Sequence, residues 1–367
     1  ECAGVEDLLF SLTKTSCQGS QEHDEHQREC LQLSLTHVHP TQRPLFKSTV
    51  FLPFIQTHHI HFKIESKTGD CEALFPMCGN WLPKKGEGVK GRPLAEVTMA
   101  TVRLDQKKRA LVRSIPSSYT KALARFFGSG PTDVDLARRQ QQHYIDILEA
   151  NGVSVHRLDS DENHPDCMFV EDQAVVVDGH MLLPVPGHPS RVAEQPPIAE
   201  YLMETLEGVQ TCTMGGEARM DGGDIIRLGD LFFVGRSSRT NDLGIASLRS
   251  LLDFFGHELR IIDIPEHALH LTSISSTPTD SIILVPEGYL KPEDFGVLPD
   301  GCELIWLPAD EAYGCNTIGL PNGKVMVAKG YPTVQEVLEE RGLETIEIDM
   351  SEIRAADGSL TCCSIFY

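Results

Sequence analysis

An internal repeat constrains the fold of this chain more than any other feature of its sequence. From residue 99 onward, short β-branched runs recur, each followed by a polar loop, by two apolar runs separated by turn residues, and by a helical stretch. The starts of these runs lie 56, 50, 45 and 41 residues apart, and the runs are Val153–Leu158, Val209–Met214, Leu259–Ile264, Leu304–Leu307 and Thr345–Ile348. One such unit is too small to bury its own apolar faces, so successive units must pack together in a ring or a row.

Turn residues predict the hairpins inside the repeat. Asx-Gly and Pro-Asn-Gly sequences between apolar runs favour tight turns, because glycine and asparagine tolerate positive φ. The four predicted hairpins are Cys167–Leu183 turning at Asp178-Gly179, Ile225–Val234 turning at Gly229-Asp230, Ser281–Tyr289 turning near Pro286-Glu287-Gly288, and Thr317–Ala328 turning at Pro321-Asn322-Gly323.

Capping residues predict where two helices begin and end. Asp133 precedes a run of apolar residues on one helical face, and Asn151-Gly152 ends it. Asn241 precedes a second such run, which Gly256 ends. Weaker helical patterns cover residues 190–206 and 333–342. Strands alternating with helices in this way define an α/β protein.

Composition excludes several functions. The 367 residues carry a formal net charge of −21, a field that repels nucleic acid and attracts small cations. The sequence has no apolar run long enough to cross a membrane and no secretory signal, so we expect a cytoplasmic protein. Eleven cysteines without a C-x-x-C pair predict reduced, mostly buried thiols and no structural metal.

The first 98 residues differ from the rest. They hold seven of the 15 histidines and five of the 11 cysteines, scattered without a paired ligand spacing, and they show no sustained helical or strand period. Met99 opens a segment typical of a translation start. We therefore expect two parts: an extension of unknown structure over residues 1–98, poorly ordered or foreign to the native protein, and a catalytic domain over residues 99–367.

The polar loops of the repeat carry the side chains that could take part in catalysis or binding. In a closed ring of units, equivalent loops point to one end of the central axis and bring their side chains together. These groups are Asp166, Glu171 and Asp172 in the first unit, Asp221 and Asp224 in the second, His270 in the third, and Cys362 and Cys363 in the last.

Acids, one imidazole and one thiol suit a flat cation. A thiolate is a nucleophile, an imidazole carries protons, and paired carboxylates match the fixed donor fork of a guanidinium group. Each residue also has a structural interpretation when taken alone. Cys362 could be a core thiol, His270 a buried structural histidine, Asp221 a turn former, and Arg191 and Arg239 surface charges.

Five motifs in register resemble the dimethylarginine dimethylaminohydrolase family. They are Pro165-Asp-Cys-Met-Phe-Val-Glu-Asp172, Asp221-Gly-Gly-Asp224, Arg239-Thr-Asn241, His270-Leu-Thr-Ser273 and Asp357-Gly-Ser-Leu-Thr-Cys-Cys-Ser364. The resemblance covers about residues 109–367. It implies the pentein fold, an α/β propeller of five ββαβ-type repeats with pseudo-fivefold symmetry.

The same resemblance implies roles for individual residues. Cys362 matches the family's nucleophile, His270 its general acid and base, and Asp221 the acid that orients the histidine. The residues that match substrate contacts are Asp166, Phe169, Glu171 and Asp172 for the guanidinium and its surroundings, Arg191 and Arg239 for the carboxylate, Ala356 for the amine, and Leu123 in a loosely aligned segment.

The activity implied is hydrolysis of asymmetric dimethylarginine and monomethylarginine to citrulline and dimethylamine or methylamine. It places the chain in arginine metabolism, citrulline biosynthesis and nitric oxide regulation. The resemblance implies a covalent intermediate on Cys362, no cofactor or metal, a small cationic substrate as the partner, and a monomer or homodimer. Arginine deimination, amidino transfer, or a pentein that binds without catalysis remain alternatives.

Overall fold

A computed structural model describes the backbone of five strands within residues 8–76 and, with side chains, residues 108–206 and 211–367. The chain divides into two units, Glu1–Met77 and Cys78–Tyr367. The first unit contains one three-stranded antiparallel sheet and one hairpin, from strands β1 (Leu8–Ser16), β2 (Glu29–His37), β3 (Lys47–Leu52), β4 (His59–Ser66) and β5 (Gly69–Pro76). The sequence predicts no elements there, and the expected boundary at residues 98 and 99 lies outside the described residues.

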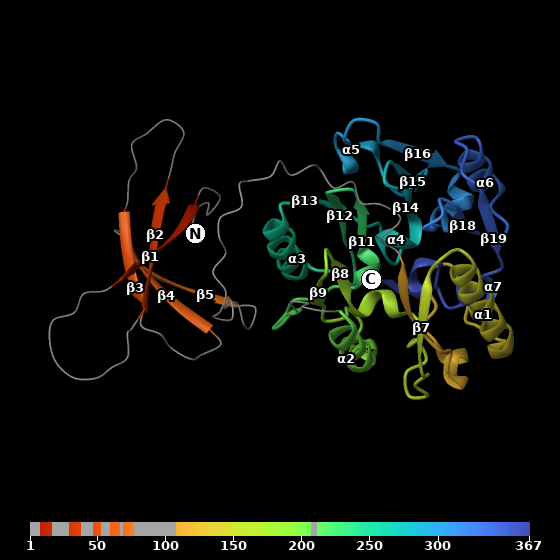
Figure 1. The fold of residues 1–367 in the computed structure, drawn as a ribbon, viewed down its shortest axis with the longest axis horizontal. Helices are drawn as coiled ribbons and strands as arrows, with labels where there is room; N and C mark the ends of the chain where they lie inside the picture. The colour runs from red at the N-terminus through yellow and green to blue at the C-terminus, as the bar shows by residue number, and fades with distance from the viewer. Residues whose placement is uncertain are drawn as a thin grey trace. The chain divides into compact units, whose positions relative to one another are not determined.

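The second unit is built from five three-stranded sheets with one pairing scheme (Figure 1). In every sheet the middle strand has an antiparallel partner on one side and a parallel partner on the other. The sheets are β20 (Ile365–Phe366), β6 (Arg109–Arg113) and β7 (Ser154–Leu158); β8 (Val175–Val177), β9 (His180–Leu183) and β10 (Thr211–Thr213); β11 (Ile225–Leu228), β12 (Leu231–Arg236) and β13 (Glu258–Asp263); β14 (Ser276–Thr279), β15 (Ile282–Pro286) and β16 (Glu303–Leu307); and β17 (Ile318–Gly319), β18 (Val325–Ala328) and β19 (Thr345–Ile348).

A helix connects each middle strand to its parallel partner, as a parallel pair requires. These helices are α1 (Val134–Ala150), α2 (Pro196–Thr205), α3 (Asp242–Phe255), α5 (Pro292–Phe295) and α6 (Pro332–Glu339). Each unit is therefore ββαβ, and the predicted β-branched runs coincide with its last strand. The last strand of the chain, β20, pairs with β6, so that the two ends of this part of the chain share a sheet.

Short helical segments occupy the loops between the repeated elements. They are η2 (Ser117–Lys121), η3 (Val170–Gln173), η4 (Pro189–Glu194), η5 (Gly222–Asp224), α4 (Leu271–Ile274), η6 (Ala309–Cys315), α7 (Ser351–Ala355) and η7 (Thr361–Cys363). Most of the predicted site residues lie in these segments or next to them.

The predicted helix caps are confirmed. The side chain of Asp133 accepts a hydrogen bond from the Leu136 amide at 2.8 Å and starts α1. Asn241 accepts one from the Gly244 amide at 2.9 Å and starts α3, and Gly256 ends this helix at φ 77°. Such caps satisfy amide groups that have no partner within the helix, so the sequence fixes these ends locally.

Three predicted hairpins are confirmed and one is wrong. The turns at Asp178-Gly179, at Gly229-Asp230 and within 321–323 join β8 to β9, β11 to β12 and β17 to β18. The fourth hairpin turns at residues 280–281, between β14 and β15, and Pro286 ends β15 instead of opening a turn. The sequence of β14, Ser-Thr-Pro-Thr, lacks the apolar alternation that marks a strand, so it escaped prediction.

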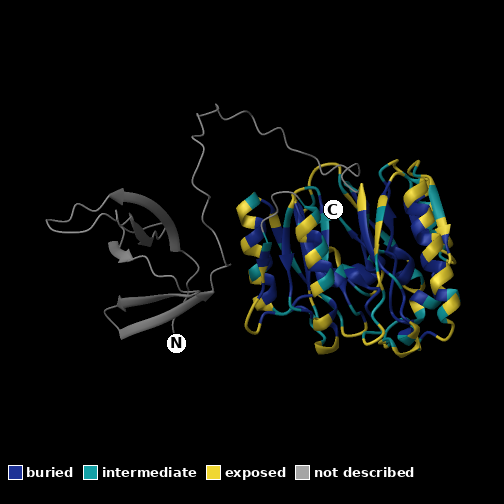
Figure 2. Cartoon of the chain, turned by 60° about the horizontal axis from the view of Figure 1, so that its bottom comes forward, coloured by how far each residue is buried: buried dark blue, intermediate teal, exposed yellow. Residues whose placement is uncertain are grey.

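The core lies between the sheets and the helices that cover them (Figure 2). The strands are largely buried, whereas the helices present an exposed face to solvent. In α3, for example, Ile245, Leu248 and Leu252 are buried against Phe232 and Val234 of β12. Within residues 108–206 and 211–367, no helix is long and apolar enough to cross a membrane.

Candidate active site

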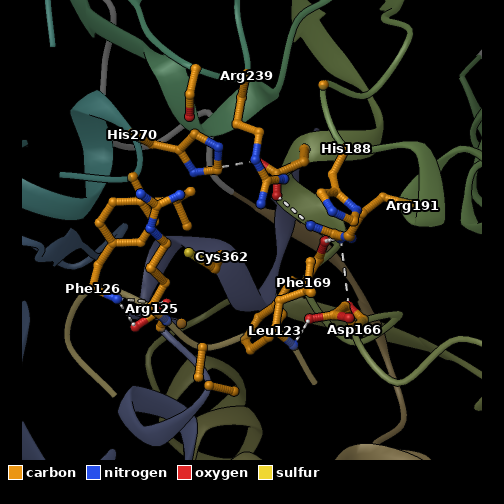
Figure 3. A pocket seen from close by; sticks show the side chains of 18 residues that line it. Leu123, Arg125, Phe126, Asp166, Phe169, His188, Arg191, Arg239, His270 and Cys362 are labelled. Carbon is orange, nitrogen blue, oxygen red and sulfur yellow. Dashed lines mark hydrogen bonds and ion pairs between the residues drawn. The ribbon is translucent and has the colours of Figure 1, made fainter. Parts of the chain in front are cut away.

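The loops of the second unit enclose a cavity of about 420 Å³ (Figure 3). Nine of the eleven predicted site residues line it: Leu123, Asp166, Phe169, Asp172, Arg191, Arg239, His270, Ala356 and Cys362. The other two, Asp221 and Glu171, contact the lining residues from behind. Side chains separated by more than 200 residues thus share one small volume.

Cys362 lies in η7, between α7 and β20. Its side chain is buried, with only 6% of the residue exposed, and its Sγ lies 3.3 Å from the Ser359 Oγ. Burial raises the pKa of this thiol well above its usual range, and the negative charges of Glu171 and Asp172 raise it further. The resting cysteine is therefore a neutral thiol, and a cation entering the cavity would favour its thiolate.

His270 and Asp221 form a buried hydrogen-bonded pair. Nε2 of His270 lies 2.9 Å from Oδ2 of Asp221, while its Nδ1 lies 4.0 Å from Oδ1 of Asp172. Burial opposes the charged imidazole, but Asp172 and the hydrogen bond to Asp221 outweigh it and raise the pKa of His270 to about 9. The same pair holds the pKa of Asp221 below its usual value although burial opposes this. His270 is therefore a protonated acid at neutral pH.

Glycine is required beside this pair. A Cβ on Gly223 would come within 2.8 Å of Nδ1 of His270 and 2.9 Å of Oδ1 of Asp172. The Gly223 amide instead donates a hydrogen bond to that carboxylate oxygen at 3.0 Å. The two glycines of the Asp221–Asp224 motif thus let the backbone approach the site closely.

Arg191 is bound into a cluster of acids. Its Nη1 donates to Asp172 at 2.8 Å, its Nε to Glu194 at 2.8 Å, and its Nη2 to the Phe169 carbonyl at 2.6 Å. Burial raises the pKa of Glu194 to about 7 even though Arg191 opposes the rise. Protein acceptors therefore already engage every nitrogen of this guanidinium.

Arg239 is more available to a ligand. Its Nη1 donates to Oδ2 of Asp221 at 3.3 Å, and its side chain remains 14% exposed at the cavity. Arg239 lies next to His188 and on the same side of the cavity as His270 (Figure 3). It places a positive charge where an anionic group of a ligand could bind.

Leu123, Asp166 and Phe169 form the opposite side of the cavity (Figure 3), and Ala356 also lines the cavity. The Leu123 amide donates to Oδ1 of Asp166 at 2.9 Å, which fixes both residues. Phe169 packs so closely against Gly358 that a Cβ there would lie 2.1 Å from its ring. A carboxylate beside an aromatic ring offers a ligand both an acceptor for N–H groups and an apolar surface.

Glu171 lies behind the nucleophile candidate. Its Oε2 accepts hydrogen bonds from Oγ1 of Thr361 at 3.0 Å and from Oγ1 of Thr272 at 3.4 Å. Burial, and then the charge of Asp172, raise the pKa of Glu171 to about 8, although the hydrogen bond from Thr361 lowers it. Glu171 is therefore largely protonated at neutral pH.

This raised pKa predicts how Glu171→Gln changes stability with pH. Between its usual pKa of 4.5 and about 8, the unfolded chain releases a proton that the folded chain retains, so the wild-type free energy of unfolding falls as pH rises. The glutamine variant lacks this fall. Denaturant titrations at pH 5 and pH 8 should show wild type losing stability relative to the variant by an amount on the order of several kcal/mol. Parallel stability curves would contradict the assignment.

Several residues that line the cavity were not predicted from the sequence. Arg125, Phe126, His188 and Asp357 also line the cavity, and Glu194 pairs with Arg191 behind it. The three-residue spacing of Arg191 and Glu194 on one helical turn was a signal for this ion pair. Asp357 is the first residue of the motif that ends at Ser364, but the sequence suggested no role for it. The others lie in loops whose conformation only the tertiary structure sets.

Three side chains offer a geometry that a metal ion could use. Ligand atoms of Asp172, Asp221 and His270 lie within 4.8 Å of one another. Arg191 and Arg239 donate to the two carboxylates, and His270 donates to Asp221, so positive groups already balance these acids. The ion pairs account for this cluster without a metal.

Comparison with known proteins identifies the structural class and the family of this chain. The fold places the chain in the pentein class, since a solved structure of a guanidino-group hydrolase from that class superposes on it. A family profile described as N,N dimethylarginine dimethylhydrolase, eukaryotic, matches residues 129–366, and the chain belongs to the dimethylarginine dimethylaminohydrolase family.

Individual relatives agree with this placement. The chain is 30% identical to the N(G),N(G)-dimethylarginine dimethylaminohydrolase of Pseudomonas aeruginosa over 260 residues, 70% of this chain and 95% of the relative. A solved structure of the Pseudomonas aeruginosa enzyme, a cysteine-to-serine mutant complexed with citrulline, has a TM-score of 0.65 at 28% identity and covers 71% of this chain and 99% of its own. The N-terminal domain of the cyanobacterial arginine dihydrolase ArgZ has a TM-score of 0.61 at 16% identity, covers 70% of this chain and 97% of its own, and shows the shared fold alone.

Proposed function

We propose that this chain hydrolyses asymmetric dimethylarginine and monomethylarginine to citrulline and dimethylamine or methylamine. The observation that carries the proposal is the single cavity shared by Cys362, His270 and Asp172. The Pseudomonas aeruginosa relative, named for this reaction, supports the substrate class, because its mutant binds citrulline.

We propose the following orientation of the substrate. Asp172 faces the guanidinium group. Glu171 ionises and joins it when the substrate binds, because a bound cation lowers the pKa of a neighbouring carboxyl. Phe169 lies alongside. Asp166, which the resemblance groups with the guanidinium contacts, accepts from the Leu123 amide, so we place it with Leu123 and the Ala356 carbonyl at the substrate amine. Arg239 and Arg191 hold the carboxylate. Arg239 supplies most of the attraction for that carboxylate, since protein acceptors already engage Arg191.

The proposed chemistry has two steps. The guanidinium cation promotes loss of the Cys362 proton to solvent, and Sγ attacks the central carbon. Protonated His270 gives its proton to the departing methylamine nitrogen, the C–N bond breaks, and a positively charged thiouronium remains on Cys362. Neutral His270 then takes a proton from water, whose oxygen attacks the same carbon. The C–S bond breaks, Sγ takes up the remaining proton of the added hydroxyl, and citrulline is released with Cys362 restored as a thiol. Asp221 orients and stabilises the imidazole in both steps.

The finer organisation of the protein is also proposed. Residues 99–367 form the catalytic domain as a five-unit propeller with pseudo-fivefold symmetry, supported by the common ββαβ pairing and by β20 closing onto β6. The proposed location is the cytoplasm, as the sequence predicts. The domain acts as a monomer or homodimer in arginine metabolism and nitric oxide regulation.

Citrulline release tests this function against its alternatives. Purified protein incubated with dimethylarginine should release citrulline and dimethylamine in equal amounts, measured by mass spectrometry. Citrulline from arginine but not from dimethylarginine would indicate a deiminase, and transfer of the amidino group to an added amine would indicate an amidinotransferase. Binding of dimethylarginine without any product would indicate a non-catalytic pentein.

We expect Arg239→Ala to raise KM far more than it lowers kcat. The substrate carboxylate lies away from the reacting carbon, so this contact is equal in the ground and transition states. Asp221 loses only its longer hydrogen bond, from Arg239 at 3.3 Å, and retains the one with His270 at 2.9 Å. Loss of a charge-assisted hydrogen bond should raise KM by about 10- to 100-fold. Arg236→Ala is the matched control, because Arg236 pairs with Asp242 and Asp263 outside the cavity. An unchanged KM in Arg239→Ala would exclude this role.

A further inference from the structure

One wall of the cavity has no regular secondary structure. The segment between η2 and α1, residues 122–133, forms neither helix nor strand, yet Leu123, Arg125 and Phe126 line the cavity. Arg125 and Phe126 lie on the other side of Cys362 from Arg191 (Figure 3). Amide groups outside helices and strands need other acceptors, so the partners of this segment decide how firmly the wall is held.

A single carboxylate accepts hydrogen bonds from four successive amides of this wall. Asp357 accepts from the amides of Phe126 at 3.0 Å, Phe127 at 2.7 Å and Gly128 at 2.8 Å, and from that of Arg125 as well. Converging amides of this kind form a concave site for a negative charge. Here the anion is a side chain of the protein itself.

Asp357 is unusual in its own backbone as well. It has φ 60°, one of two non-glycine residues with positive φ among the described residues, and only 6% of it is exposed. Such a conformation persists only where surrounding contacts enforce it, and it is concentrated at functional sites. Asp357 follows Ala356 directly and precedes Cys362 by five residues, so it connects the wall to the loop that carries the thiol.

We infer that Asp357 is a positioning residue that holds residues 125–128 as the substrate-facing wall of the cavity. The kinetic part of this inference rests on the proposed function. Without the carboxylate, the wall samples several conformations, and substrate binding has to order it again. Affinity for the substrate therefore falls, whereas turnover at saturation, where bound substrate has ordered the wall, changes little.

Two substitutions remove the carboxylate and still allow the backbone conformation of residue 357. Asp357→Asn keeps the size of the side chain and one acceptor oxygen for Phe126, Phe127 and Gly128, but its amide nitrogen replaces the oxygen that accepts from Arg125. Asp357→Gly removes the side chain, and both asparagine and glycine tolerate φ 60°. Glu352→Gln is the matched control, because Glu352 accepts from the amides of Thr132 at 2.7 Å and Asp133 at 3.0 Å, beyond the cavity lining.

Three measurements on the full chain test the inference. In Asp357→Gly we expect KM for dimethylarginine to rise about tenfold or more, and in Asp357→Asn by less, with kcat of both within about twofold of wild type. Hydrogen exchange should accelerate at residues 125–128 but not in the core strands, and iodoacetamide should alkylate Cys362 faster in the absence of substrate. Glu352→Gln should match wild type in KM and in the alkylation rate.

The outcomes separate this inference from the proposed function. Faster exchange with unchanged KM would overturn the inference, because the wall would then have no part in binding. Unchanged exchange and alkylation would also overturn it, because the contact would not hold the wall. If wild type turns over no methylarginine, the proposed function fails, and the exchange and alkylation measurements still decide whether Asp357 holds the wall.

Discussion

Replacing Cys362 by serine is expected to lower kcat with dimethylarginine by a factor on the order of 10⁴ or more, while the substrate still binds. A serine hydroxyl ionises far less readily than a thiol, and protonated His270 cannot take its proton. Steady-state citrulline release measures turnover, and isothermal titration measures binding.

The adjacent cysteine provides the control for this experiment. Cys363 is also buried, but its Sγ donates to the Ser359 carbonyl at 3.3 Å and does not line the cavity. Cys363→Ser can make the same hydrogen bond, so it should keep wild-type kcat. Full activity in Cys362→Ser, or loss of activity confined to Cys363→Ser, would refute the assignment of the nucleophile.

Replacing His270 by glutamine is expected to lower kcat by about 10²- to 10⁴-fold while dimethylarginine still binds. Glutamine can still hydrogen-bond to Asp221, but it cannot protonate the departing amine or deprotonate water. The same citrulline assay measures the loss, and titration with substrate shows that the cavity is retained.

A second buried histidine serves as the control for His270. Nε2 of His257 lies 2.6 Å from Asp178, and its Nδ1 lies 3.4 Å from Asp230, in turns that do not line the cavity. His257→Gln should lower stability and leave kcat unchanged. Equal loss of kcat in both variants would mean that His270 acts through folding and not through proton transfer.

Much of the fold could be predicted because its signals are local. Asp133, Asn241 and Gly256 cap helices through contacts within one turn of the chain, and Asp178-Gly179 forms a tight turn by its own φ values. Strand β14 could not be predicted in this way. Its polar residues are strand only because β15 pairs with them, and such pairing depends on a partner and not on sequence pattern.

The site shows the same division. The family resemblance identified nine residues that line the cavity, because it records the result of a tertiary arrangement. It did not reveal that Arg191 is already engaged by Asp172, Glu194 and Phe169, or that Asp357 accepts from four amides more than 200 residues away. These contacts join different loops, and no spacing along the chain encodes them.

The sequence by itself determined the repeated unit, the helix ends, most of the turns and the chemical types available to the site, because these depend on neighbours within a few residues. Only the tertiary structure decided which charges balance one another, which thiol is buried beside which acids, and which carboxylate holds the cavity wall. Those outcomes depend on distance and burial, since burial and nearby charges together set the protonation of Cys362, Glu171 and His270.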